Sequence, residues 1–300
     1  MDDNFLTVVE RMAMELERSS LFFGHGTDNA FDEAAWLVAH AAGVDLASDD
    51  DLPWDDPISD SALAAAERLL TERLATRKPL AYLLHEAWFA GERFFVDERV
   101  IVPRSHLGSW IVEQFAPFVD VSAVADILDL CTGSGCIAVA LARHFPSARV
   151  VASDLSAAAL EVSAKNVASK GFEDRVSLAT GDLFAASDPQ TFDLIVSNPP
   201  YVADEIMQDL PDEYHFEPSM AFAGGPGGLD VVVRILKESA ARLNDGGVLV
   251  VEAGSAGKEL IDHFPDAPFT WLAVDDGEDD VVFLITRDDL LRYFQTNFKA

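Results

Sequence analysis

The chain has 300 residues, 49% hydrophobic and 24% charged, which suffices for one large domain or two of ordinary size with buried cores. Its 52 acidic and 21 basic residues give a formal net charge of −31, spread over the whole sequence. A field of this sign repels phosphate backbones, argues against direct binding of nucleic acid, and attracts basic partners. Adaptation to a salty or acidic medium, or simple solubility, explains the same excess, so charge alone names no partner.

Neither a membrane segment nor a metal site is expected. No apolar run approaches the roughly 20 residues of a membrane-spanning helix, and Met1-Asp2-Asp3-Asn4 lacks the basic start of a signal peptide. We therefore expect a cytoplasmic protein. Cys131 and Cys136 match neither a redox pair nor a zinc framework, and the histidines lack metal-ligand spacing. We interpret both cysteines as buried thiols, and the acidic stretch 275–280 as a solvated turn.

The first part of the chain is predicted to be helical. Apolar residues at helical spacing indicate helices at 5–16, 28–42 and 59–75, with a further turn of helix at 79–84. Asn4 or Thr7 caps the first helix. The acidic, proline-containing stretch Ala47–Pro57 is predicted to be a loop. Two β-prone segments, 87–90 and 93–96, flank Gly91-Glu92 and predict a hairpin.

From about Ser105 strands and helices alternate. The expected strands cover 127–130, 149–152, 175–178, 192–197, 247–252, 269–274 and 281–285, and the expected helices 135–144, 156–170 and 229–243. This order is typical of a doubly wound α/β sheet, and Gly277 suggests a turn between a final antiparallel pair. We predict a helical substrate-recognition domain at 1–85, a hairpin linker at 86–104 and a catalytic domain at 105–300.

A glycine-rich segment, Asp129-Leu130-Cys131-Thr132-Gly133-Ser134-Gly135-Cys136-Ile137-Ala138, follows the first of these strands and opens a helix. Its glycines let the backbone turn sharply beside a ligand, and the helix N-terminus offers unpaired N–H groups. Asp154 ends the next strand, where a carboxylate accepts hydrogen bonds from ribose hydroxyls. The segment predicts a nucleoside-type ligand. It also fits a dinucleotide fingerprint, so NAD stays open at this point.

Two further aspartates favour S-adenosylmethionine over NAD. Asp129 precedes the glycines, where its carboxylate would face the cationic amino acid end of that cofactor but would repel a pyrophosphate. Asp182, followed by Leu183, comes after the third strand and is placed to accept from an adenine amino group. A plain turn aspartate is the alternative for Asp182.

The tetrad Asn198-Pro199-Pro200-Tyr201 closes the apolar strand 192–197, at the sheet edge where open α/β folds bind substrates. An amide nitrogen is a poor nucleophile because its lone pair is delocalised. An asparagine oxygen and a backbone carbonyl that accept its two N–H groups orient it and increase its electron density. The prolines stiffen that carbonyl, and Tyr201 offers a flat face to a planar amide or base. This tetrad decides against NAD.

The tetrad and the glycine loop together resemble class I methyltransferases that act on exocyclic or amide nitrogen. The helical start, the hairpin and Val102-Pro103-Arg104 resemble the protein N(5)-glutamine methyltransferases in particular. Within that family, the stretches 79–91, 95–100 and 268–272 resemble the PrmB-type group that acts on ribosomal protein L-three. The release-factor group typically continues its Pro-Arg with proline and acidic residues, whereas 105–108 reads Ser-His-Leu-Gly here.

The resemblance implies a Rossmann-like, seven-stranded domain that uses S-adenosylmethionine to methylate a glutamine of that basic ribosomal protein. Catalytic roles fall to Asn198, Pro199, Pro200 and Tyr201. Cofactor contacts are expected from Asp129, Cys131, Thr132, Gly133, Ser134, Gly135, Asp154, Asp182, Leu183 and Asn198.

Departures from the family pattern lie at His85, at His215-Phe216 and at 252–255, and they concern the substrate loops. The glycine-rich stretch 224–228 is predicted to be a mobile loop, with a substrate lid as a further interpretation. The alternatives are a release-factor glutamine methyltransferase, an adenine-N(6) DNA methyltransferase, and a non-catalytic cofactor-binding assembly factor.

Overall fold

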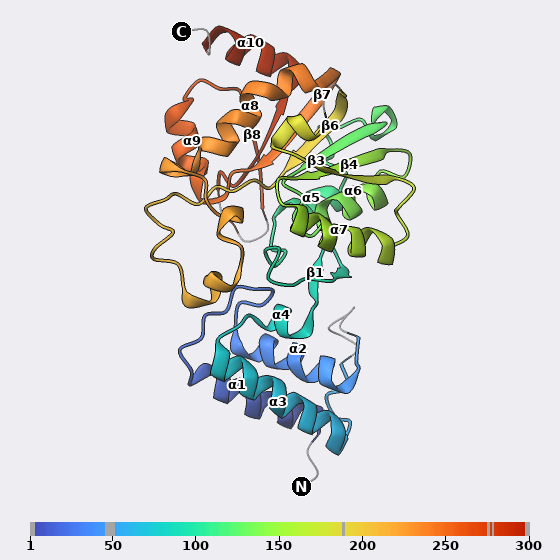
Figure 1. Ribbon diagram of the computed structural model, residues 1–300, viewed down its shortest axis with the longest axis vertical. Coiled ribbons are helices and arrows are strands. Elements are labelled where there is room, and N and C mark those ends of the chain that lie inside the picture. The colour runs from blue at the N-terminus through green and yellow to red at the C-terminus, as the bar shows by residue number, and fades with distance from the viewer. Residues whose placement is uncertain (1–3, 46–51, 188–189, 275–276, 278, 298–300) are drawn as a thin grey trace. The chain divides into compact units, whose positions relative to one another are not determined.

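The computed structural model describes residues 4–45, 52–187, 190–274, 277 and 279–297 (Figure 1). The chain divides into two compact units. Unit 1 contains residues 1–98, 102–104 and 211–217, and unit 2 contains 99–101, 105–210 and 218–300. The loop predicted at 47–57 and the turn predicted at 275–280 lie partly outside the described residues. No helix in the described ranges is long and apolar enough to cross a membrane.

Unit 1 is built on helices. They are α1 (Phe5–Glu17), α2 (Ala30–Ala42), α3 (Asp60–Thr76) and α4 (Leu80–Leu84). Asn4 and Thr7 together form a capping box at the start of α1, so both predicted cap residues are used. The apolar stripe that predicted α1 is buried, with Val8, Val9 and Leu16 fully inaccessible.

The hairpin of unit 1 consists of β1 (Ala87–Phe89) and β2 (Glu92–Phe94). Its turn is Ala90-Gly91, and both residues have positive φ, 48° and 75°. Such a two-residue turn matches the twist of an antiparallel pair. The predicted turn at Gly91-Glu92 is wrong by one residue, because Glu92 pairs with Phe89 in the ladder.

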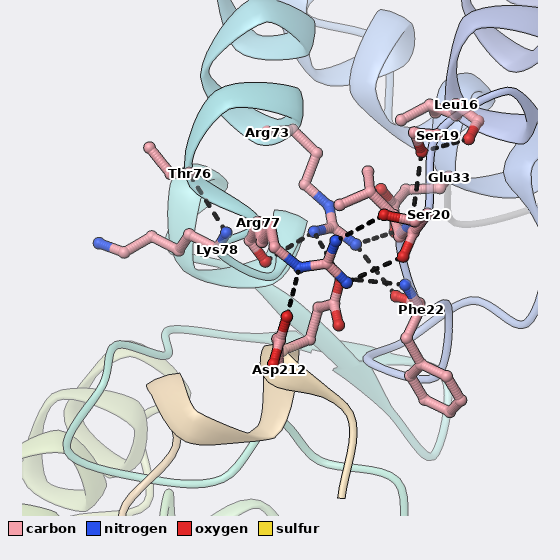
Figure 2. A network of polar contacts seen from close by, with 12 residues as sticks. Leu16, Ser19, Ser20, Phe22, Glu33, Arg73, Thr76, Arg77, Lys78 and Asp212 are labelled. Atoms are coloured by element: carbon pink, nitrogen blue, oxygen red, sulfur yellow. Dashed lines mark hydrogen bonds and ion pairs between the residues drawn. The ribbon is translucent and has the colours of Figure 1, made fainter.

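The segment Pro211–Glu217 belongs to unit 1 although it follows the tetrad in sequence. It contains the short 3-10 helix η4 (Asp212–Phe216). Figure 2 shows the polar network that holds it: Arg77 contacts Asp212 and the Ser20 carbonyl, while Arg73 contacts the Phe22 carbonyl. Nothing in the local sequence of this segment predicts its place in unit 1.

Buried charges form the centre of this network. Arg73 is only 1% exposed and donates from Nε to Glu33 Oε1 at 2.8 Å. Glu213 is fully buried. Its carboxylate forms an ion pair with Arg77 at 2.8 Å and accepts a hydrogen bond from the Phe22 N–H at 3.0 Å. Burial raises the pKa of Glu33, and Arg73 partly offsets that rise. Removing one partner of such a set leaves another charge buried and unpaired.

Unit 2 is a seven-stranded sheet with strand order β5-β4-β3-β6-β7-β9-β8. Strands β3 to β7 are parallel, and β9 runs antiparallel to both of its neighbours. The strands are β3 (Asp126–Leu130), β4 (Arg149–Asp154), β5 (Val176–Thr180), β6 (Phe192–Ser197), β7 (Leu243–Glu252), β8 (Thr270–Leu272) and β9 (Val282–Thr286). The predicted α/β fold with a seven-stranded sheet and an N-terminal helical region is confirmed, while the exact domain boundaries stay a prediction.

Helices cover both faces of this sheet (Figure 1). On one face, α6 (Cys136–His144) and α7 (Ala157–Ser169) pack on β3 to β5, and on the other, α8 (Asp230–Arg242) and α10 (Arg287–Asn297) pack on β7. Alternate residues of the strands, such as Leu128 and Leu249, join Ile235 and Leu290 in one core. The buried sheet therefore fixes where the strand ends lie.

Three helices of unit 2 are not predicted from the sequence. They are α5 (Leu107–Val112), α9 (Gly257–His263) and α10 (Arg287–Asn297). Helices α5 and α9 span at most two turns, so no periodicity develops. Helix α10 is strongly polar, and its inward face includes Leu290 and Phe294, which are both buried. Packing against the sheet therefore stabilises these helices more than their own sequence does.

Candidate functional site

The glycine loop lies between β3 and α6 and repeatedly adopts the left-handed conformation. Cys131, Gly133 and Gly135 have φ values of 61°, 55° and 80°. Glycine enters this region freely, but a cysteine there costs about 1–3 kcal/mol and needs support from its surroundings. Leu183, on another loop of the same unit, also has positive φ, at 49°. Strained backbone of this kind clusters at ligand sites.

Helix α7 holds the glycine loop in place. Ser163 Oγ donates to the Gly133 carbonyl at 2.7 Å, and Asn166 Nδ2 donates to the Ser134 carbonyl at 2.8 Å. A Cβ added to Gly135 would come within 3.1 Å of the Ser163 Cβ, so the close approach of α6 and α7 needs a glycine there. Sequence reasoning missed both polar residues. Their only signal is two polar side chains on the apolar face of an amphipathic helix.

Asp154 sits at the end of β4 and is fixed by backbone donors. Its Oδ2 accepts from the Gly133 N–H at 2.9 Å and its Oδ1 from the Ser156 N–H at 2.8 Å. Burial raises the pKa of this carboxyl. Each oxygen keeps a further lone pair after these bonds, so the carboxylate is oriented and still able to accept from a pair of ligand hydroxyls.

Asp129, at the end of β3, is fully buried. Thr132 donates to its Oδ2 at 2.5 Å. The Asp129 Oδ1 has no hydrogen bond of ordinary geometry in the part of the chain described, although the Ala138 N–H at the start of α6 lies close enough to lower the pKa of the carboxyl in part. Burial raises the pKa of this carboxyl to about 7. A buried acceptor without a donor favours a cationic or N–H-bearing group nearby.

A pocket of about 300 Å³ opens beside these groups, entirely within unit 2. Of the predicted site residues, seven line it: Cys131, Gly133, Asp154, Asp182, Leu183, Asn198 and Pro200. Asp129, Thr132, Ser134 and Gly135 are not among its lining residues; Asp129 is joined to the loop by its hydrogen bond from Thr132. Apolar walls come from residues that the sequence did not single out: Val100, Ile101, Leu155, Met220 and Val231.

Two arginines at the pocket were also missed. Arg234 of α8 lines the pocket and forms an ion pair with Asp182 at 2.8 Å. Arg99 lines it as well and pairs with Glu161 at 2.8 Å. Both pairs are substantially exposed, so they contribute orientation more than stability. The Asp182 carboxylate is therefore at the pocket, as predicted, with Arg234 bound to its Oδ2.

The tetrad begins where β6 ends. Ser197 Oγ donates to the Leu130 carbonyl of the neighbouring strand at 2.9 Å, which anchors the strand end. Asn198 and Pro200 line the pocket, whereas the buried Pro199 and the half-buried Tyr201 are not among its lining residues. The structure thus brings Asn198 into one pocket with the glycine loop and Asp154.

Tyr201 is held by a buried acid at the end of β7. Its hydroxyl donates to Glu252 Oε1 at 3.1 Å, and the other oxygen accepts from Ser105 Oγ at 2.5 Å and from the His106 N–H at 3.0 Å. Glu252 is fully buried, and this burial raises its pKa while the three donors partly counter the rise. Glu252 was noted in the sequence only as part of a departure from the family pattern.

The glycine-rich stretch 224–228 packs against the tetrad. The Val202 N–H donates to the Phe222 carbonyl at 2.8 Å, and the Gly224 N–H donates to the Val202 carbonyl at 2.9 Å. A Cβ on Gly228 would overlap the Tyr201 carbonyl, and one on Gly254 would overlap the Tyr201 ring. The stretch, predicted to be a mobile loop, is hydrogen-bonded in the structure and forms part of a glycine cradle around Tyr201.

Neither thiol is poised as a nucleophile. Cys131 and Cys136 are free, and burial raises the pKa of both, so they remain protonated at neutral pH. Within the described ranges, no group of three or more His, Cys, Asp or Glu residues could hold a metal ion. The groups gathered at the pocket, the Asp154 carboxylate and the Asn198 side chain, can orient a ligand by hydrogen bonding.

Known proteins resemble this chain along most of its length. The profile of the "Methyltransferase small domain" family matches residues 113–211, and that of the "PrmC N-terminal domain" matches residues 17–84. A relative from Francisella tularensis, "Ribosomal protein uL3 glutamine methyltransferase", is 40% identical over 93% of this chain and 88% of its own length. Relatives with that name from Neisseria meningitidis serogroup A and Burkholderia pseudomallei are both 44% identical, over 91% and 94% of this chain and 89% and 94% of their own lengths.

Proposed function

The chain belongs to the family of ribosomal protein uL3 glutamine methyltransferases, and we propose that it methylates a glutamine side-chain amide of uL3, the ribosomal protein L-three. The resemblance predicted from the tetrad and the glycine loop is thereby confirmed at the level of the family. The methyl donor is S-adenosylmethionine, which supplies an electrophilic methyl group on a sulfonium when bound.

The residues of the pocket fit this cofactor. The buried Asp129 carboxylate beside the glycine loop suits a cationic amino acid group, and the oriented Asp154 carboxylate that lines the pocket suits a ribose diol. Leu155, Leu183 and Val231 give the pocket apolar walls of the kind that a purine ring packs against. The individual cofactor contacts, including those expected from Thr132, Ser134 and Gly135, remain a proposal.

Asn198 is assigned the central catalytic role. Its side-chain oxygen and the backbone carbonyl of Pro199 would accept the two N–H groups of the glutamine amide and turn its nitrogen toward the methyl donor. Pro199 carries no N–H that would compete, and Pro200 keeps it extended. The amide loses its proton after transfer, when it is strongly acidic, so the site needs no general base.

Tyr201 completes the proposed amide site as a flat surface. Its hydroxyl is bound to Glu252 and its ring abuts Gly254, so the ring is fixed before substrate arrives. A preorganised face loses little conformational entropy on binding. Glu252 acts through Tyr201 and is a positioning residue.

One observation carries the proposal: Asn198 lines the same pocket as Gly133 and Asp154. Cofactor site and amide site would then share one cavity, as direct methyl transfer requires. Incubation with methyl-labelled S-adenosylmethionine and purified uL3, with a release factor as the competing substrate, tests it. Label on uL3 supports the proposal, whereas label confined to the release factor refutes the substrate assignment.

The other candidate functions have less support. A release-factor enzyme is disfavoured by the relatives, whose printed names specify uL3. A DNA adenine enzyme is disfavoured by the net charge of −31. A binding-only assembly factor is disfavoured by the intact tetrad, and cofactor binding without turnover on uL3 would support it.

A further inference from the structure

A second cavity, of about 740 Å³, lies wholly within unit 1 and takes no part in the site described above. Its lining is unusual because it combines aromatic rings with a pair of carboxylates. The residues concerned are Phe31, Trp36, Trp54, Trp88, Asp28 and Asp32. We refer to this set as the aromatic groove.

The rings of the aromatic groove are held by their neighbours. Phe31 stacks on Trp54 with centroids 6.0 Å apart and an interplanar angle of 25°, and Phe5 meets the edge of Trp54 at 5.6 Å. Trp36 donates its indole N–H to Glu86 Oε1 at 2.7 Å. Phe31 nevertheless remains 39% exposed. Trp54 and Trp88 are half-buried and Trp36 is buried, so Phe31 and the open parts of Trp54 and Trp88 are the ring surface available to a ligand. Such fixed aromatic surface attracts cations through the ring quadrupole.

The two carboxylates are fixed by a single amide. Asn29 Nδ2 donates to Asp28 Oδ1 at 2.6 Å and to Asp32 Oδ2 at 2.7 Å, while Asn29 Oδ1 caps α2 by accepting from the Asp32 N–H at 2.9 Å. Both aspartates are exposed. One amide thus holds two negative charges side by side at a surface lined with aromatic rings.

Arg104 also lines the groove, but its charge is already balanced. Its Nη1 and Nη2 bind Glu217 Oε1 and Oε2 at 2.8 and 2.7 Å, and the guanidinium lies 5.2 Å from the centroid of the Tyr214 ring. Arg104 lowers the pKa of Glu217, which falls to about 2 despite burial. The groove therefore presents a net negative charge to a ligand.

Two polar atoms of the groove lining have no partner. The indole N–H of Trp88 and the hydroxyl of Thr27 are shut off from water and meet no hydrogen-bond partner within the described part of the chain. An unsatisfied buried donor costs about 1–3 kcal/mol. A peptide carbonyl that reached Trp88 after a small movement of the groove wall would supply the missing acceptor.

From this juxtaposition we infer that the aromatic groove docks an arginine side chain of the protein substrate. A guanidinium is planar, stacks on indole, and donates in a fork that matches a pair of carboxylates, whereas a lysine ammonium offers neither geometry. The inference rests on the proposed function, because a basic ribosomal protein would bring the arginine. It adds a recognition site in unit 1 that is separate from the glutamine pocket in unit 2.

The kinetic test compares two charge-matched variants on purified uL3. In the Asp28→Asn/Asp32→Asn variant the amides keep the bonds to Asn29 but remove both charges, and KM for uL3 should rise about tenfold while kcat stays within about twofold. The control, Glu15→Gln/Glu17→Gln, removes two exposed charges on α1 and should leave KM unchanged. Equal KM values for the two variants would overturn the inference.

A binding test removes the dependence on catalysis. The enzyme contains five tryptophans, and those at 36, 54 and 88 line the groove, while Trp110 and Trp271 lie elsewhere. N-acetyl-arginine-N-methylamide should shift the indole N–H resonances of the groove set, that of Trp88 most, and its neutral citrulline analogue should not. Shifts equal to those of Trp110 and Trp271 would refute the arginine site. A wild-type enzyme that binds this probe but leaves uL3 unmethylated would instead refute the proposed function.

Discussion

The hydroxyl of Tyr201 donates to Glu252 Oε1 at 3.1 Å and so ties the last residue of the tetrad to the end of the neighbouring strand. Strands β6 and β7 are parallel, and beyond a register shift between Phe192 and Leu194 they pair regularly, with Ser197 opposite Val251. Their carboxyl ends therefore lie together, as in other open α/β sheets. The contact attaches the loop that begins at Asn198 rigidly to the core of unit 2.

Glu252→Gln should lower kcat by about 10- to 100-fold with little change in cofactor affinity, because an amide NH₂ would face donors that now meet a carboxylate. Tyr201→Phe removes the other end of the contact. Since Glu252 is proposed to act on the tetrad through its hydrogen bond to Tyr201, the double variant should be scarcely slower than Glu252→Gln alone. The measurement is a double-mutant cycle on kcat with uL3, and fully additive losses would contradict the coupling. Glu259→Gln, an exposed control on α9, should behave as wild type.

Gly254→Ala should abolish most activity. Gly254 has φ of 48°, and a Cβ there would overlap the Tyr201 ring. Gly246→Ala is the matched control, because Gly246 also has positive φ, at 77°, but a Cβ there meets nothing within 4 Å. Both variants carry the left-handed cost of about 1 kcal/mol, so only displacement of Tyr201 separates them. Equal activity of the two variants would argue against the glycine cradle.

The affinity for S-adenosylmethionine should increase as pH rises toward 7. Asp129 has its pKa raised to about 7 by burial, so it is largely protonated below that pH in the cofactor-free enzyme. A cationic group bound nearby favours the ionised carboxylate, and binding below pH 7 must therefore release a proton. Isothermal titration calorimetry between pH 5.5 and 8 measures this, and a flat profile would count against the role of Asp129. Asp129→Asn should bind more weakly and with little dependence on pH.

The same raised pKa has a consequence for the cofactor-free protein. A carboxyl whose pKa is higher in the folded state stabilises the fold most at low pH, where it is protonated in both states. That contribution is lost as pH rises through about 7. Because the cofactor favours the ionised form, it should protect the enzyme more at pH 8 than at pH 5.5.

Arg73→Ala should destabilise the protein by about 3–5 kcal/mol, since it leaves Glu33 buried without its ion partner. Arg68→Ala, an exposed site on the same helix, should change stability by less than about 0.5 kcal/mol. Urea denaturation followed by circular dichroism compares the two. Equal midpoints would show that the network of Figure 2 contributes no stability.

Residues that line the pocket could be predicted from the sequence where each directly follows the end of a strand. Gly133, Asp154 and Asn198 each follow a recognisable strand, and all three line the pocket. Ser163, Arg234 and Glu252 were not assigned functional roles, because each reaches the site from an element distant in sequence. Their roles depend on the packing of α7, α8 and β7, which periodicity alone does not specify.

Long-range pairing also explains what was missed in unit 1. Glu213 accepts from the Phe22 N–H across 191 positions of sequence, and this contact helps to bind the segment after the tetrad to the helices. A single predicted boundary at residue 104 cannot assign the later segment 211–217 to unit 1. Cap residues such as Asn4, by contrast, act within one turn and were predicted from the sequence.

The most direct test of the central claim is mass spectrometry of uL3 after incubation with S-adenosylmethionine and either wild-type enzyme or Asn198→Ala. The wild type should add about 14 Da, the mass of one methyl group replacing a hydrogen, to a single glutamine. Asn198→Ala should methylate uL3 at least about 100-fold more slowly while its affinity for the cofactor stays near normal. Unmodified uL3 with wild-type enzyme, or full activity of Asn198→Ala, would contradict the account.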